Sequence, residues 1–260
     1  MNTQSVKKPL LCAAALLFSS TCLVAHADQQ YTFDVAQGGT LHLKTDVGAL
    51  DVDTHGDDSV EIEVLIEGKD ADDFAVDAKQ QGNDVWIRGE VTHGHRWRQQ
   101  LKVRYTLRVP HHYDLDLKTA GGGIDIADLR GNIQAHTSGG SISIGSVQGN
   151  VNVHTSGGSI RTDKVDGQID AHTSGGSITV TFASQPTQDA ELHTSGGSIT
   201  AYLPSDVQLD VNATTSGGRV RSDFDVDGRV KKQAIRGTIN GGGPRLKLHT
   251  SGGSVSLKEH

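Results

Sequence analysis

The sequence predicts an all-β protein: a right-handed parallel β-solenoid of about 18-residue, two-strand coils, with an N-terminal antiparallel β excursion acting as a cap. A string that contains a glycine pair recurs at a modal period of 18 residues. Apolar and polar side chains alternate within each repeat, which is the period of a β-strand. Bulky side chains are scarce, since 32 of the 260 residues are glycine and only 4% are aromatic. This composition argues against one large α/β core.

Residues 1–27 are expected to be a signal peptide. Two lysines precede an apolar stretch from Pro9 to Val24, and Ala25-His26-Ala27 is a small-x-small cleavage site. Both cysteines lie in this segment, so the mature chain would hold no disulfide. A lipid anchor on Cys22 is the alternative, which Ser19-Ser20-Thr21 does not favour. The sequence therefore predicts an exported protein that is periplasmic, secreted or at the cell surface, without a transmembrane segment.

Residues 28–117 are predicted to form an N-terminal β region. Its first coil spans 41–52, because the segment around Thr45 fits the repeat template. The excursion over 53–117 holds alternating apolar runs separated by polar turns, which predicts antiparallel hairpins. We expect it to cover the N-terminal end of the solenoid, with Trp86 and Tyr105 supplying the bulk that the repeats lack.

Residues 118–260 are predicted to form the solenoid proper, in one continuous domain with 28–117. Five full copies of His-Thr-Ser-Gly-Gly-Ser and three degenerate ones begin at 118, 136, 154, 172, 193, 214, 233 and 249. Each copy has two short strands and glycine turns, in which glycine accepts a positive φ. One coil buries few side chains alone, so coils must stack at about 4.8 Å. We expect eight coils, ending on the strand 255–258.

Two kinds of inward column are expected from this stacking. Aliphatic columns are predicted at Ile124, Ile142, Ile160, Ile178 and Ile199, and at Ile133, Val151 and Ile169. A ladder in which each hydroxyl bonds to its neighbours is predicted at Thr119, Thr137, Thr155, Thr173, Thr194, Thr215 and Thr250. Both would stabilise the stack and neither would be a site.

These motifs resemble those of a known family. A Gly-Gly-Thr-Leu-x-Leu-x-Thr start at 38–45, a Leu-x-Val-Pro at 107–110 and serial Thr-Ser-Gly-Gly-Ser-Ile coils are similar to the bacterial putative-adhesin family of exported β-solenoid proteins, a domain of unknown function. The resemblance covers about 31–257. It implies a β-solenoid in the cell envelope, and it carries over no catalytic residue.

An outward histidine column is the candidate metal site. Coils in register would place His136, His154, His172 and His193 near 5 Å apart, roughly the spacing of neighbouring strands. Adjacent imidazoles at that spacing can share a zinc, copper or nickel ion. The alternative is that coil duplication copied a solvated polar residue that binds nothing.

A second candidate site lies in the excursion. The segment 92–99 concentrates His95, Arg96, Trp97 and Arg98 in an acidic chain, and we expect it at the tip of a hairpin. A tryptophan flanked by arginine is typical of recognition surfaces for anionic glycans, lipid headgroups or acidic proteins. The alternative is that Trp97 packs back onto the solenoid.

The sequence favours a non-enzymatic exported adhesin or cell-envelope scaffold that binds an envelope or surface component, protein or glycan, through its repetitive polar face. No nucleophile elbow, phosphate loop or His-Glu-x-x-His motif occurs, so no catalytic residues are predicted. The formal net charge of -7 argues against nucleic acid. The alternative function is a periplasmic transition-metal-binding protein that uses the histidine column.

Overall fold

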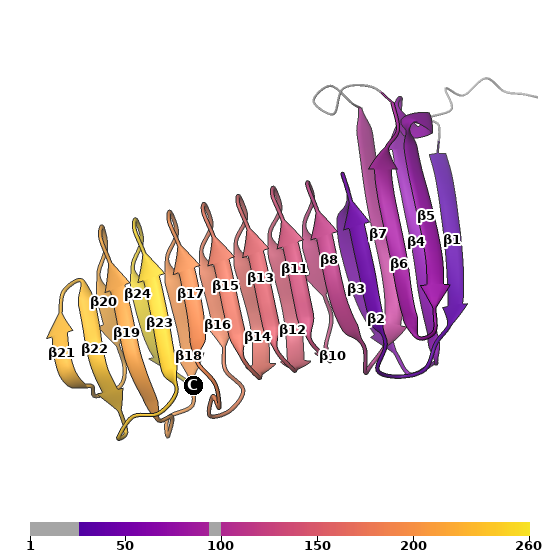
Figure 1. Cartoon of the computed structure of the whole chain (residues 1–260). Helices are drawn as coiled ribbons and strands as arrows, with labels where there is room; N and C mark the ends of the chain where they lie inside the picture. The colour runs from indigo at the N-terminus through magenta and orange to yellow at the C-terminus, as the bar shows by residue number, and fades with distance from the viewer. Residues whose placement is uncertain (1–25, 94–99) are drawn as a thin grey trace, which may run out of the picture.

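The protein is a β-solenoid in a computed structural model, which describes residues 26–93 and 100–260 (Figure 1). Two twelve-stranded sheets run the length of the molecule, and successive parallel coils contribute one strand to each. A single cluster of buried apolar side chains forms the core. The predicted all-β fold with stacked parallel coils is confirmed. In the described part of the chain no helix is long and apolar enough to cross a bilayer.

The strands follow one another across each sheet in a fixed spatial order. The first sheet runs β1 (His26–Asp34), β4 (Ser59–Gly68), β7 (Leu101–Pro110), β3 (Ala49–His55), β9 (Ile124–Ile126), β12 (Ile142–Gln148), β14 (Ile160–Asp166), β16 (Ile178–Thr181), β18 (Ile199–Leu203), β24 (Val255–Glu259) and β20 (Val220–Ser222), with β10 (Leu129–Arg130) paired to β12. The second sheet runs β21 (Asp227–Lys231), β22 (Ala234–Ile239), β19 (Leu209–Thr215), β23 (Arg245–Thr250), β17 (Ala190–Thr194), β15 (Ile169–Thr173), β13 (Val151–Thr155), β11 (Ile133–Thr137), β8 (Asp114–Thr119), β2 (Thr40–Thr45), β6 (Asp84–Val91) and β5 (Phe74–Gln81). A short 3-10 helix, η1 (Ala71–Asp73), precedes β5.

The aliphatic columns form as predicted, because the parallel strands pair with their repeats in register. Ile124, Ile142, Ile160, Ile178 and Ile199 are aligned on consecutive strands, as are Ile133, Val151 and Ile169. Each is at most 2% exposed. Side chains at odd and even positions therefore face opposite sides of each sheet, and a residue repeated every 18 positions returns to the same column.

The coils do not stack in sequence order, which corrects the expected series of eight. β23 lies between β17 and β19, and β24 lies between β18 and β20, as the yellow strands in Figure 1 show. The degenerate copy at 233 is not a coil, since β22 runs antiparallel to β19 and forms a hairpin with β21. The copy at 249 retains the full motif. Its histidine, threonine and two glycines therefore have the same spacing along the chain as those of the copy at 193.

The N-terminal excursion extends both sheets. β6 and β7 run parallel to β2 and β3, and antiparallel partners follow: β5 beyond β6, then β4 and β1 beyond β7. Tyr105 is fully buried, as expected. The expectation for Trp86 was wrong: it lies between the buried Val85 and Ile87, so strand alternation turns its side chain to the outer face.

Close approach of the coils, rather than positive φ, explains the second glycine of each pair. At Gly140 an added Cβ would lie 2.1 Å from the carbonyl oxygen of Gly122 in the preceding coil, and the same holds along the stack. In the full copies positive φ occurs in the opposite turn instead, where Gly149 has a φ of 150°, and in the motif turn it occurs only in the degenerate copies, at Gly48 and Gly122. The expectation that the motif glycines serve for positive φ is therefore corrected.

The buried threonines bond to the backbone rather than to one another. Thr155 Oγ1 donates to the carbonyl oxygen of Gly140 at 2.7 Å and accepts from the Gly158 N–H at 3.3 Å. Equivalent bonds to the preceding coil are made by Thr137, Thr173, Thr194, Thr215 and Thr250. The predicted hydroxyl ladder is wrong, because a parallel neighbour offers a carbonyl oxygen closer to each hydroxyl than the next hydroxyl.

One buried threonine lacks such a bond, and this difference predicts opposite effects of the same substitution. Thr162 is 2% exposed, and its Oγ1 has no hydrogen-bond partner among the described residues. We expect Thr162→Val to raise the free energy of unfolding by about 1 kcal/mol and Thr155→Val to lower it by about 1–3 kcal/mol. Urea unfolding of both variants measures this, and the same sign for both would contradict the assignment.

Candidate functional site

The outer face of the second sheet carries two parallel rows of polar side chains. The first, called the basic row, runs from β6 to β23 and consists of Arg88, Lys44, Lys118, His136, His154, His172, His193 and His249. The second, called the acceptor row, lies two residues earlier on β8 to β17 and consists of Asp116, Gln134, Asn152, Asp170 and Glu191. Trp86 and His42 continue the acceptor row onto β6 and β2.

The structure brings the four predicted histidines into one column. Ring centroids are 4.9 Å apart for His136 and His154, 6.5 Å for His154 and His172, and 5.6 Å for His172 and His193. His249 extends the column, with its centroid 5.2 Å from that of His193. The predicted column did not include His249, which stacking in sequence order would place three coils from His193.

The column does not present a preformed metal centre. The rings of His136 and His154 are within 5° of parallel, so their in-plane nitrogen lone pairs do not converge on one point. Over residues 26–93 and 100–260, no group of three or more His, Cys, Asp or Glu side chains could hold a metal ion. His172 instead lies beside Asp170, whose Oδ1 is 2.7 Å from its Nε2.

Two histidines of the column have perturbed proton affinity. Partial burial lowers the pKa of His154, and the charges of His136 and His172 lower it further. Burial likewise lowers the pKa of His193, with His249 and His172 as the next largest causes. At neutral pH these two imidazoles therefore remain neutral polar groups on the surface.

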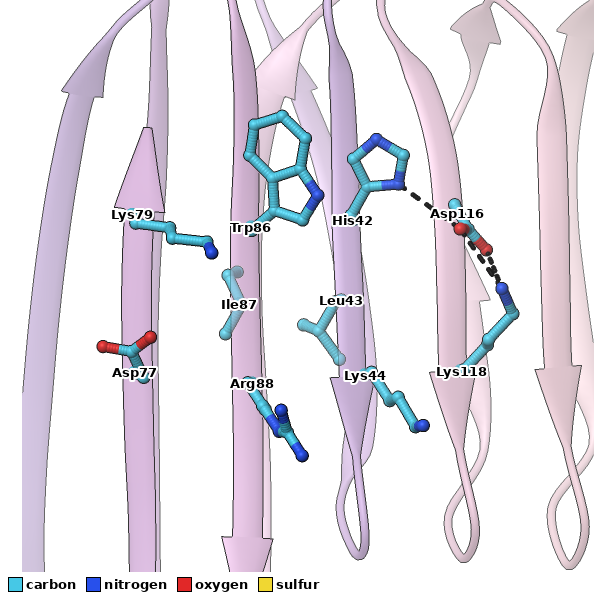
Figure 2. Close-up of a pocket in the computed structure, with 10 residues that line it drawn as sticks. All are labelled: His42, Leu43, Lys44, Asp77, Lys79, Trp86, Ile87, Arg88, Asp116 and Lys118. Atoms are coloured by element: carbon cyan, nitrogen blue, oxygen red, sulfur yellow. Dashed lines mark hydrogen bonds and ion pairs between the residues drawn. The ribbon is translucent and has the colours of Figure 1, made fainter. Parts of the chain in front are cut away.

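A groove of about 400 Å³ lies at the N-terminal end of the rows (Figure 2). The rings of Trp86 and His42 lie on neighbouring strands with centroids 5.0 Å apart and planes 14° from parallel. Figure 2 shows the faces of both rings toward the viewer, above β6 and β2. Four basic and two acidic side chains surround them: Lys44, Lys79, Arg88, Lys118, Asp77 and Asp116.

Asp116 connects the groove to both rows. Its Oδ1 lies 2.9 Å from Lys118 Nζ, and its Oδ2 lies 3.3 Å from His42 Nδ1. Burial disfavours the ionised carboxyl, but hydrogen bonds from Lys118 and His42 outweigh it and lower the pKa of Asp116 below its ordinary value. Lys44 and Lys79, by contrast, form no ion pair with any described residue. The groove thus keeps uncompensated positive charge.

Sequence reasoning missed this groove although two signals were present. Lys44 and Lys118 precede the motif threonine at the position that histidine holds in the full copies, so they belong to the same row. Strict alternation around Trp86 also indicated an outward side chain. The other predicted site, formed by His95, Arg96, Trp97 and Arg98, lies outside the described residues.

A family model covers the second half of the chain. Residues 131–258 match the model described as Toastrack DUF4097. Over these residues the chain is similar to that family. The resemblance to an adhesin-like family of unknown function is thereby confirmed. The Toastrack residues hold all five histidines of the basic row, whereas Trp86, His42 and the three longer cations lie before them.

Comparison with solved structures gives low identities over most of the chain. A putative adhesin from Bacteroides fragilis NCTC 9343 is 12% identical, with 90% of this chain and 97% of that chain covered and a TM-score of 0.41. A putative adhesin from Parabacteroides distasonis ATCC 8503 is 10% identical, with 91% and 98% covered and a TM-score of 0.41. A putative lipid binding protein from the same organism is 11% identical, with 89% and 97% covered and a TM-score of 0.30. No curated protein matches the chain.

Proposed function

We propose that this protein is an exported, non-enzymatic adhesin or envelope scaffold that holds a cell-envelope or cell-surface component against the outer face of the second sheet. The observation that supports this proposal is the convergence on one face of the basic row, the acceptor row and the groove at Trp86. A ligand laid across the strands would contact all three at once. The export step rests on the signal peptide expected at 1–27.

The pairing and ionisation of the carboxylates on this face support binding rather than catalysis. Asp116 is paired with Lys118, Asp170 with His172, and Glu191 with Lys247 at 2.6 Å. Hydrogen bonds and the charge of Lys247, together with the neighbouring histidines, lower the pKa of Glu191 despite partial burial. The lowered pKa values of Asp116 and Glu191 keep these two carboxylates ionised, whereas a general acid needs a raised pKa.

Site-specific photo-crosslinking in cells tests the proposal. A benzophenone amino acid at Gln134 would sit on the outer face of the second sheet, and the same probe at Arg161 would sit on the outer face of the first. Both positions are exposed, so they form a matched pair. We expect a specific envelope adduct from position 134 and none from position 161. Identical adducts from both positions, or none from position 134, would overturn the proposal.

A further inference from the structure

The basic row begins with three long cationic side chains on adjacent strands. Arg88, Lys44 and Lys118 are exposed and aligned across β6, β2 and β8, at the strand spacing of about 4.8 Å. Like charges directly opposite one another on neighbouring strands are destabilising. Glu90 pairs with Arg88 and Asp116 with Lys118, whereas Lys44 has no ion pair among the described residues. The row is therefore complementary to a ligand that carries negative charges in a line along the solenoid axis.

The acceptor row selects among polyanions. Asp116 presents carboxylate oxygens beside Lys118, and Gln134, Asn152 and Asp170 present amide and carboxylate oxygens beside the histidines. A depression of about 460 Å³ lies over the last three. Hydroxyl groups of a sugar donate hydrogen bonds to such oxygens. A phosphodiester or polyphosphate backbone has no donor to offer to these oxygens. The paired rows therefore fit a ligand that combines carboxylates with hydroxyls.

The groove supplies an aromatic surface at the end of the rows. The Trp86 and His42 rings lie among Lys44, Lys79 and Arg88 on an open sheet face. The apolar C–H face of a sugar ring packs on a flat aromatic ring, while cations at its edge pair with a carboxylate. The volume of about 400 Å³ lies in the range of small-ligand sites.

We propose that the ligand of this face is a linear acidic polysaccharide. It lies across the strands with one sugar packed on Trp86 and His42, its carboxylates on the basic row and its hydroxyls on the acceptor row. This inference rests on the proposed function and names the class of component bound. The Toastrack residues lengthen the contact through Gln134, Asn152 and the histidines, and the groove anchors it.

Calorimetric titration of the full mature protein with polygalacturonate, dextran and polyphosphate of matched length tests the inference. We expect polygalacturonate to bind, dextran to show no measurable binding, and polyphosphate to bind at least about tenfold more weakly. Trp86→Ala and the double variant Lys44→Gln, Lys118→Gln should each weaken polygalacturonate binding by about tenfold. Thermal unfolding of each variant verifies that the fold is retained, and His42→Gln serves as a second groove variant.

The control for charge is the double variant Lys102→Gln, Lys164→Gln on the first sheet, where both side chains are exposed. It removes the same charge, so polygalacturonate affinity should stay within about twofold of that of the wild type. Equal weakening by both double variants, or equally tight polyphosphate binding, would overturn the inference in favour of general electrostatic attraction. If polygalacturonate does not bind but a specific adduct forms at position 134, the inference that the ligand is an acidic polysaccharide is overturned and the proposed function is retained. Absence of both would overturn both.

Discussion

Gly140→Ala should lower the free energy of unfolding by about 3 kcal/mol or more, although it adds one methyl group at a partly exposed turn. The new Cβ would lie 2.1 Å from the Gly122 carbonyl oxygen and 2.3 Å from its carbon, both backbone atoms. Relief would require the two coils to separate, and the strand hydrogen bonds and the bond from Thr137 Oγ1 to the Gly122 carbonyl oxygen oppose separation. Urea unfolding with an unchanged m-value measures the loss.

The neighbouring glycine provides a matched control. An added Cβ at Gly139 meets nothing closer than the Gly121 Cα at 3.8 Å, which is ordinary contact. Gly139→Ala should therefore change the free energy of unfolding by less than about 1 kcal/mol. Equal destabilisation by the two substitutions would show that turn conformation, rather than contact between coils, dictates the glycines.

Removal of residues 245–260 should disrupt the C-terminal third of the solenoid. The lost strands are interior: β23 pairs with β17 and β19, and β24 pairs with β18 and β20. The loss of each strand therefore removes two strand-strand interfaces. It also removes buried side chains, among them Leu248 and Val255. We expect β19 to β22 to lose amide protection in hydrogen exchange, because no neighbouring coil remains to pair with β19 and β20.

Stacking in sequence order predicts a different outcome for the same truncation. The last repeat would then be a terminal coil, and its loss would leave β19 and β22 protected. Full protection of the amides in β19 after truncation would thus contradict the interior position of β23.

The repeat alone was enough to predict the coil, because an 18-residue period and strict alternation of apolar and polar residues place Ile142 and Ile160 in the buried core. The spatial order of the coils was not predictable in the same way. The last steps between repeats are irregular, and only the pairing of strands decides that the copy at 249 lies beside the copy at 193. A local pattern does not encode which distant neighbour a strand selects.

The site was predicted in part for a related reason. The histidines were found because their motif is identical in each copy, whereas Lys44 and Lys118 hold the same position in degenerate copies. Trp86 was assigned to the core because of its residue type. Its neighbours Val85 and Ile87 are buried, however, so alternation along the strand places Trp86 on the outer face. Position within the register, rather than residue type, determines which side chains share a surface.

Titration of the imidazoles by NMR tests most directly that distant repeats assemble one continuous row. Burial and the charges of His249 and His172 lower the pKa of His193, whereas His249 is not among the groups that lower the pKa of His154. In the variant His249→Gln, the pKa of His193 should therefore rise toward its ordinary value while that of His154 stays unchanged. An unchanged pKa of His193 would show that His249 is not its neighbour and would contradict the continuous row.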